Sequence, residues 1–274
     1  MKVFNLQDTS FSHIEYTAPG IIANDIKWDR ECKSDAPTFY THEKMLDAVE
    51  VNDKPKYGLM LESQAILPGV YAQLPHHMHK FKTVFTHSSF LLTNFSNTKW
   101  IPGGSIWVGG SYGGGERRIY DKTKLCSMVS SDKKMCQLHR IRIALAEFLE
   151  GQNTGIDFYG SMFGKWVPII ETLQDYKFSI CIENYIDDDY FTEKILNCFA
   201  TGTIPVYIGA KNIKNKFNGD GIIQVSKPGE MIDAIAEFVN DDFYASRKDA
   251  IEENFNIALT YDVLEEYIVG RYGL

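Results

Sequence analysis

The chain has 274 residues, of which 44% are hydrophobic and 13% aromatic, and its formal net charge is -8. This composition predicts a packed globular protein, long enough for one large core or two compact halves, and it excludes a disordered chain. The acidic balance argues against a nonspecific nucleic-acid surface, which needs clustered Lys and Arg. A local basic pocket for one anionic ligand remains compatible with it.

Residues 1–12 contain no basic segment followed by an apolar run, and no stretch approaches the ~20 apolar residues of a membrane span. We therefore expect no integral membrane segment and a cytoplasmic location. The five cysteines are widely spaced and lack a C-x-x-C pair. This spacing favours reduced structural thiols over a disulfide framework or a zinc site.

The first half contains short apolar segments punctuated by turns. Strands are predicted at residues 3–6, 20–23, 57–61 and 83–86. Residues 41–51 carry Met45, Leu46 and Val49 at helical spacing, so a connecting helix is expected there.

Residues 102–118 include seven glycines, which predict a flexible loop near a domain boundary. A phosphate cradle is the alternative, but no Gly-Lys-Ser/Thr sequence follows. Trp100 and Trp107 lie beside these glycines, and aromatic faces suit either stacking on sugars or packing in a core. We expect one of the two in the core.

Strands and helices alternate in the second half. Strands are expected at residues 125–130, 177–182, 204–208 and 222–225. Helices are expected at residues 139–149, 192–200 and 231–239, with one or two surface helices within 246–271. In the first of these helices, the inward-facing side chains should be Ile141, Leu145, Phe148 and Leu149. Such alternation predicts an α/β domain with a mainly parallel sheet.

The most informative stretch is residues 176–209, YKFSICIENYIDDDYFTEKILNCFATGTIPVYIG. An apolar strand ends there in an E-N pair, and open parallel sheets bind ligands at the carboxyl ends of strands. Thr192 is a good N-cap, which leaves Glu193 and Lys194 in the first helical turn, where anions bind. Lys194 can meet a phosphate and Glu193 can accept hydrogen bonds from ribose hydroxyls. The alternative is that both are ordinary residues on a helix surface.

This stretch resembles the donor-binding motif of the family 10 glycosyltransferases, the α1,3/α1,4-fucosyltransferases. In that motif an E-N strand end is followed by D-Y-x-T-E-K, a helix and a G-x-x-P-V-x-x-G strand. The resemblance implies contacts with GDP-fucose at four positions, Asn184, Tyr190, Glu193 and Lys194. The family has Ser after E-N, whereas this chain has Tyr185, a departure that keeps a related sugar open as the donor.

Two arginines upstream are candidates for binding the diphosphate of the donor. Ser130 and Ser131, followed by Arg140 and Arg142 at a helix start, resemble the family's serine loop and its diphosphate-binding arginine. The best register gives this role to Arg142. Arg140 is the rival, because two arginines two residues apart cannot share one helix face. His139 is expected beside the pocket.

The first half offers Glu62 as a candidate base. The strand predicted at residues 57–61 delivers Glu62 to its carboxyl end, and L-x-L-E-S resembles the position of the family's catalytic glutamate. A carboxylate can take the proton from an acceptor hydroxyl while that oxygen attacks the anomeric carbon opposite the leaving nucleotide, so the reaction inverts. Arg142 and Lys194 would stabilise the charge on the leaving diphosphate. No metal and no other cofactor is then expected.

Two other motifs suggest metal sites. The run from Asp187 to Asp189 matches the D-x-D manganese site of another glycosyltransferase fold, although the resemblance makes Asp189 a structural residue before the donor helix. Three closely spaced histidines could bind a transition metal: His76, His77 and His79. An acceptor-side loop is preferred there, because no Cys or paired carboxylate is nearby.

Together with these patterns, the resemblance implies an α/β fold of the GT-B type, with two Rossmann-like domains facing a cleft. Residues 1–120 would form the acceptor side and residues 121–274 the donor side. The expected reaction moves fucose, or a related sugar, from a GDP-sugar to a glycan hydroxyl. The alternatives are the same fold using another nucleotide sugar, and a catalytically silent protein that binds glycan or nucleotide.

Overall fold

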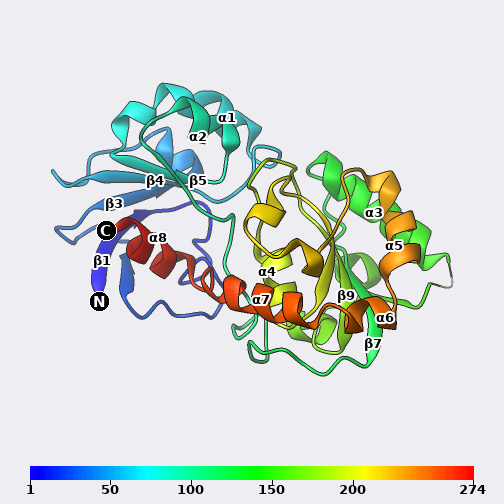
Figure 1. Ribbon diagram of the computed structural model, residues 1–274. Helices are drawn as coiled ribbons and strands as arrows, with labels where there is room; N and C mark the ends of the chain where they lie inside the picture. The colour runs from blue at the N-terminus through cyan, green and yellow to red at the C-terminus, as the bar shows by residue number, and fades with distance from the viewer. Residues whose placement is uncertain (153) are drawn as a thin grey trace.

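The computed structural model describes residues 1–152 and 154–274, which form two parallel β-sheets in separate lobes (Figure 1). The first sheet has the order β2-β1-β3-β4-β5-β6 and the second the order β11-β10-β9-β7-β8. The strands of the first sheet are β1 (Lys2–Gln7), β2 (Ile26–Asp29), β3 (Thr38–Thr41), β4 (Lys56–Met60), β5 (Thr83–Thr86) and β6 (Thr98–Trp100). Those of the second sheet are β7 (Lys124–Val129), β8 (Ile156–Tyr159), β9 (Tyr176–Ile182), β10 (Ile204–Ile208) and β11 (Ile223–Gln224).

Helices connect the strands and pack around both sheets. The α-helices are α1 (Pro68–Gln73), α2 (Ser89–Asn94), α3 (Gln137–Glu150), α4 (Glu193–Phe199), α5 (Met231–Phe238), α6 (Asp241–Ala245), α7 (Lys248–Leu259) and α8 (Leu264–Tyr272). Adjacent strands in both sheets run parallel. The predicted parallel α/β organisation is therefore confirmed.

The end of the chain returns to the first sheet. Leu264 and Ile268 of α8 are buried in the same apolar cluster as Phe4 and Leu6 of β1. Figure 1 shows α8 beside β1, with both chain termini in the same lobe. The domain boundary at residue 120 stays a prediction, and the structure adds that the last helix packs into the core of the first half.

Two local predictions in the first half are wrong. Residues 20–23 form a turn and coil rather than a strand, since Gly20 has φ +72° and a Cβ there would lie 2.5 Å from Ser111 N. The helix predicted at residues 41–51 is wrong: only the short 3-10 helix η1 (His42–Met45) forms there, and Thr41 belongs to the buried strand β3, which pairs with β1 and β4. Sheet pairing at Thr41 overrides helical propensity at the start of this segment.

The second half follows the sequence prediction closely, apart from the strand β8 and the short helix α6, which were not predicted, and a change in side-chain direction. Phe148 of α3, expected to face inward, is 49% exposed, whereas Ile143 and Ala146 of the same helix are buried. The buried face of α3 is centred on the side of Leu145 away from Phe148. Which face is buried depends on how the helix packs against the sheet.

The first part of the glycine-rich segment, residues 102–108, is packed between the two halves, whereas several residues from Gly109 to Arg118 are exposed. Its side chains Ile106 and Val108 are fully buried. The N–H groups of Trp107 and Val108 donate to Asn197 Oδ1 of α4 at 2.8 and 3.1 Å. Trp100 is the core tryptophan of the predicted pair, since it packs against the apolar cluster that contains Phe191 and Tyr261.

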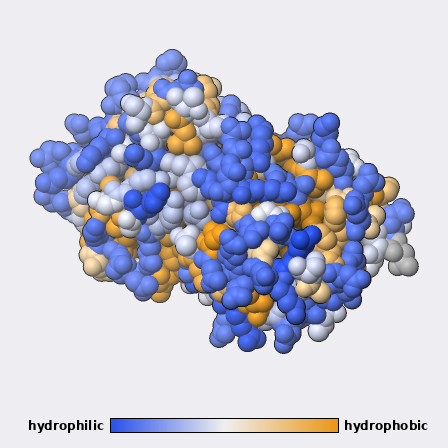
Figure 2. All heavy atoms as spheres, in the orientation of Figure 1, coloured by the Kyte–Doolittle hydropathy of each residue, from blue (hydrophilic) through white to orange (hydrophobic). Residues whose placement is uncertain are grey.

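Each lobe has its own buried apolar cluster. The face of the molecule shown in Figure 2 is mostly hydrophilic, with smaller hydrophobic areas between. Within the described ranges of the chain, every helix is too short or too polar to cross a bilayer.

Candidate functional site

A cavity of about 590 Å³ lies where strand ends from the two sheets come together. Its walls include residues that follow β1 and β4 in the first sheet and β7 and β9 in the second. The six predicted site residues all line it: Glu62, Arg142, Asn184, Tyr190, Glu193 and Lys194. The fold therefore brings them to one place, and their individual roles stay predictions.

Lys194 is a cation fixed at the start of α4. Thr192 caps this helix as predicted, with its hydroxyl oxygen accepting from Lys194 N at 3.3 Å. The Lys194 ammonium lies 3.0 Å from Glu193 Oε1 and 3.4 Å from Glu183 Oε2. Burial acts to lower the pKa of Lys194, but these two carboxylates raise it above its ordinary value. Lys194 therefore stays charged at neutral pH.

Glu183 organises this corner of the cavity, although it was not among the predicted site residues. It is fully buried, and its two oxygens accept from Thr192 N at 2.9 Å and from Thr192 Oγ1 at 2.8 Å. Burial raises the pKa of Glu183, and the neighbouring Lys194 acts in the opposite direction. The E of the E-N pair was the available signal, because an acid at a buried strand end needs partners on the next element.

We expect Glu183→Gln to lower the free energy of unfolding by about 3 kcal/mol, the scale of removing one partner from a buried ion pair. A glutamine has one acceptor oxygen for the two Thr192 donors. Its NH₂ group would face one of these donors and cannot accept from it. Urea unfolding of the variant and the wild type measures the difference. Glu237→Gln, at an exposed glutamate of α5, is the matched control and should change little. Equal stability of Glu183→Gln and wild type would contradict this role.

Arg142 is the arginine that faces the cavity. It is 8% exposed, and its Nη2 donates to Ser131 Oγ at 2.8 Å, so it joins the serine loop to α3. Its Nε is buried without a hydrogen-bond partner, and burial lowers the pKa of the guanidinium. Arg140 is exposed and does not line the cavity. The geometry thus favours Arg142 over its rival.

Tyr190, Asn184 and Glu62 lie together in the wall of the cavity. Tyr190 Oη donates to Asn184 Oδ1 at 2.7 Å. Tyr185, the departure from the family motif, lies edge-on to Tyr190 with ring centroids 6.3 Å apart. Burial raises the pKa of Glu62, whereas the charge of Lys194 acts to lower it. A raised pKa suits a group that exchanges a proton with a substrate.

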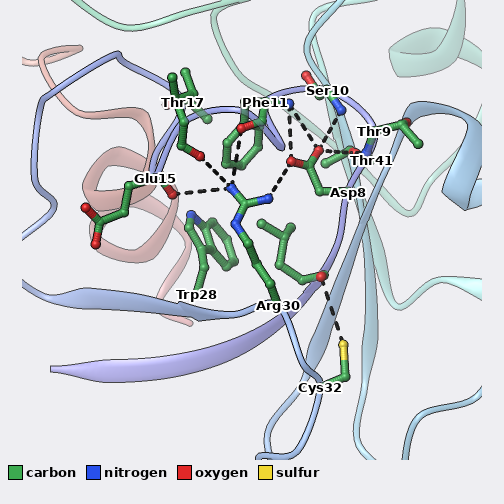
Figure 3. A network of polar contacts seen from close by, with 12 residues as sticks. Asp8, Thr9, Ser10, Phe11, Glu15, Thr17, Trp28, Arg30, Cys32 and Thr41 are labelled. Atoms are coloured by element: carbon green, nitrogen blue, oxygen red, sulfur yellow. Dashed lines mark hydrogen bonds and ion pairs between the residues drawn. The ribbon is translucent and has the colours of Figure 1, made fainter. Parts of the chain in front are cut away.

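The loop after β1 forms part of the wall on the side of the first sheet. Arg30 holds this loop, since its Nη1 donates to Asp8 Oδ2 at 2.8 Å and its Nη2 to the carbonyl of Ile14 at 2.9 Å (Figure 3). The guanidinium also lies 5.0 Å from the ring centroid of Phe11. Phe11 and Ile14 line the cavity. Sequence reasoning missed this loop because a separated Asp and Arg form no recognisable motif.

Three further side chains of the wall carry polar or aromatic groups. His139 lines the cavity, and burial together with the charge of Arg142 lowers the pKa of its imidazole to about 4. It is therefore neutral at pH 7. Lys133 and Trp107 also line the cavity, so Trp107 is the tryptophan of the predicted pair that a ligand can reach.

The structure places the two predicted metal motifs as follows: the aspartates have protein partners, and the histidines lie away from the cavity. Asp187 accepts from the N–H of Ser89 at 3.0 Å, which links the two halves, and Asp188 pairs with Lys211 at 3.1 Å. The histidine-rich segment, residues 76–79, belongs to short 3-10 turns after α1 and does not line the cavity. In the described part of the chain, no group of three His, Cys, Asp or Glu side chains is placed to hold a metal ion.

Comparison with known sequences points to one family. Residues 119–247 match the family model of glycosyltransferase family 10 (fucosyltransferase), C-terminal part. The chain is 37% identical over 83 residues to a putative fucosyltransferase-like protein of Arabidopsis thaliana. It is 36% identical over 90 residues to a 4-galactosyl-N-acetylglucosaminide 3-alpha-L-fucosyltransferase 9 of Bos taurus. These matches cover 29% and 30% of this chain but only 16% and 25% of the relatives.

Comparison with solved structures extends the likeness to both halves. A crystal structure of an alpha1,3-fucosyltransferase has a TM-score of 0.56 at 17% sequence identity, over 86% of this chain and 79% of that one. Its complex with GDP-fucose has a TM-score of 0.52 at 16% identity, with the same coverage. At such identities the likeness establishes the fold alone, and the predicted GT-B architecture is confirmed.

Proposed function

We propose that the chain, whose residues 119–247 match the model of glycosyltransferase family 10, transfers fucose, or a related sugar, from a GDP-sugar to a hydroxyl of a glycan. We also propose that the transfer inverts the anomeric centre and needs no metal ion. The observation that carries this proposal is the convergence of Glu62 with Arg142 and Lys194 in one cavity, from opposite halves of the fold. A proton acceptor thus faces two cations, as the reaction requires.

The cations act on the leaving group. When the bond between the sugar and the diphosphate breaks, negative charge grows on the phosphate oxygens. Arg142 has a buried Nε without a partner, so a phosphate oxygen would fill a hydrogen bond that the protein leaves open. Lys194 adds a second fixed positive charge, and together these side chains supply what a divalent ion would otherwise contribute.

The acceptor is activated from the other side. Glu62 follows β4 and would take the proton of the attacking hydroxyl as its oxygen bonds to the anomeric carbon. Attack opposite the diphosphate inverts the centre. Asn184 lines the cavity together with Glu62, and it accepts a hydrogen bond from Tyr190 Oη on the side proposed to bind the donor.

The proposal is tested by calorimetric titration with GDP, and with UDP as the control, in the presence of a chelator. We expect GDP to bind and UDP to bind at least about tenfold more weakly, because a site that hydrogen-bonds one base leaves its polar groups unpaired with another. Transfer from GDP-fucose to a panel of glycans, also with chelator, then measures the activity.

Each other outcome assigns a different function. Binding of UDP alone would support the same fold with another nucleotide sugar. Nucleotide binding only after manganese is added would return the run from Asp187 to Asp189 to consideration as a metal site. Tight GDP binding without transfer to any glycan of the panel would favour a catalytically silent binding protein.

A further inference from the structure

The main chain at the end of β4 is held by side chains instead of by the next strand. The N–H groups of Leu61 and Glu62 both donate to Nε2 of His42, at 3.2 and 3.1 Å. His42 is 2% exposed, so water does not compete for this nitrogen. Because both partners are donors, Nε2 must carry the lone pair and the imidazole hydrogen must lie on Nδ1.

Two more side chains hold the carbonyl groups of the same two residues. Tyr71 Oη donates to the carbonyl oxygen of Glu62 at 2.9 Å. His87 Nε2 lies 3.1 Å from the carbonyl oxygen of Leu61 and must donate, since a carbonyl oxygen only accepts. Every main-chain polar group of Leu61 and Glu62 therefore has a side-chain partner, and this set of three side chains is called the Glu62 clamp below.

His42 has an unusual backbone conformation for this contact. Its φ is 44°, in the left-handed region that residues with a Cβ rarely adopt. The preceding residue is fixed, because Thr41 Oγ1 donates to Asp8 Oδ1 at 2.6 Å in the network of Figure 3. Backbone outliers of this kind persist where the surroundings determine them, and they occur often at functional sites.

We propose that His42 is a positioning residue for Glu62: by accepting both N–H groups, it turns the chain after β4 so that the Glu62 carboxylate points into the cavity. This inference rests on the proposed role of Glu62 as the base. Burial lowers the pKa of His42 to about 4, so the accepting lone pair is present at neutral pH. The residues proposed to bind the nucleotide sugar lie in the other half of the chain. We therefore expect His42 to affect the transfer step and not the binding of nucleotide.

The test compares His42→Met, which has no comparable acceptor, with His42→Gln, whose amide oxygen can accept two hydrogen bonds. We expect His42→Met to lower kcat by about 10- to 100-fold, the scale of a displaced catalytic group, with the affinity for GDP unchanged. His42→Gln should recover most of the lost kcat. Equal losses in the two variants, or weaker GDP binding in both, would indicate a general structural role and overturn the proposal.

A double variant separates this proposal from the proposed function. If His42 acts through Glu62, adding His42→Met to Glu62→Gln should cost no further activity, because effects of groups that act as a unit are not additive. Near-normal transfer by Glu62→Gln alone would refute the base, and this inference with it. A large loss for Glu62→Gln combined with a further full loss in the double variant would refute the positioning role only.

Tyr71→Phe keeps the test open if His42→Met does not fold. This change removes one hydroxyl from the Glu62 clamp and should lower kcat about fivefold, the equivalent of one neutral hydrogen bond. Tyr244→Phe is the matched control, because Tyr244 Oη donates to a carbonyl, that of Gly202, at 2.8 Å in the other half. Equal kcat values for these two tyrosine variants would count against the clamp.

Discussion

Glu62→Gln is expected to lower kcat by about 10² to 10⁴, the usual contribution of a general base, while GDP binds as in the wild type. The amide keeps the size of the side chain but has no basic oxygen for the acceptor proton. Nucleotide affinity should hold because Arg142 and Lys194, on the opposite wall, are untouched. Steady-state transfer and calorimetric titration with GDP measure the two quantities.

The pH profile of kcat/KM gives an independent view of the same group. Burial raises the pKa of Glu62 above the ordinary glutamate value of 4.5, and only the ionised form can accept a proton. Activity should therefore be lost as the pH falls through that raised pKa. Glu62→Gln should lack this acidic limb, whereas Glu50→Gln, at an exposed glutamate of the same half, should retain it. An acidic limb that persists in Glu62→Gln would assign the base to another residue.

Arg142→Met is expected to weaken GDP binding by about 10- to 100-fold, because a charge-assisted hydrogen bond contributes about 1.5 to 3 kcal/mol. Methionine preserves much of the apolar stem within α3 but removes the guanidinium. In the described part of the chain Arg142 has no ion-pair partner, so the change leaves no carboxylate unpaired. Calorimetric titration with GDP measures the loss.

Arg140→Met is the matched control for this prediction. It removes the same charge two residues away on the same helix, from a side chain that is exposed and lies outside the cavity. Its GDP affinity should stay within about twofold of the wild type, as for most surface substitutions. If GDP affinity fell strongly in Arg140→Met alone, Arg140 would be the arginine that binds the diphosphate.

Local patterns were sufficient for much of the second half, residues 121–274. The strand β10 has the predicted bounds, and the Thr192 cap lies where the sequence placed it. These features depend on interactions within a few residues, such as a hydroxyl that accepts from an N–H two positions later. The T-E-K and E-N motifs therefore predicted the end of β9, the start of α4 and the residues there that line the cavity.

The first half depends more on contacts between distant residues, and there local reasoning was weaker. Residues 38–41 form a strand because they pair with β1 and β4 on either side, a fact that no local spacing encodes. The unusual backbone of His42 follows from its place between this strand and the end of β4. A lone histidine in an unremarkable segment gave no reason to expect contact with Glu62.

The sequence by itself determined the parallel α/β class, the donor motif and the identity of the six candidate residues. Only the tertiary structure showed that Arg142 and not Arg140 lines the cavity, that α8 packs against the first sheet, and that His42 contacts the main chain of Leu61 and Glu62. The physical reason is the range of the interactions involved. Capping, strand propensity and helical periodicity act over a few residues and can be read locally, whereas burial and the pairing of polar groups depend on which distant segments meet.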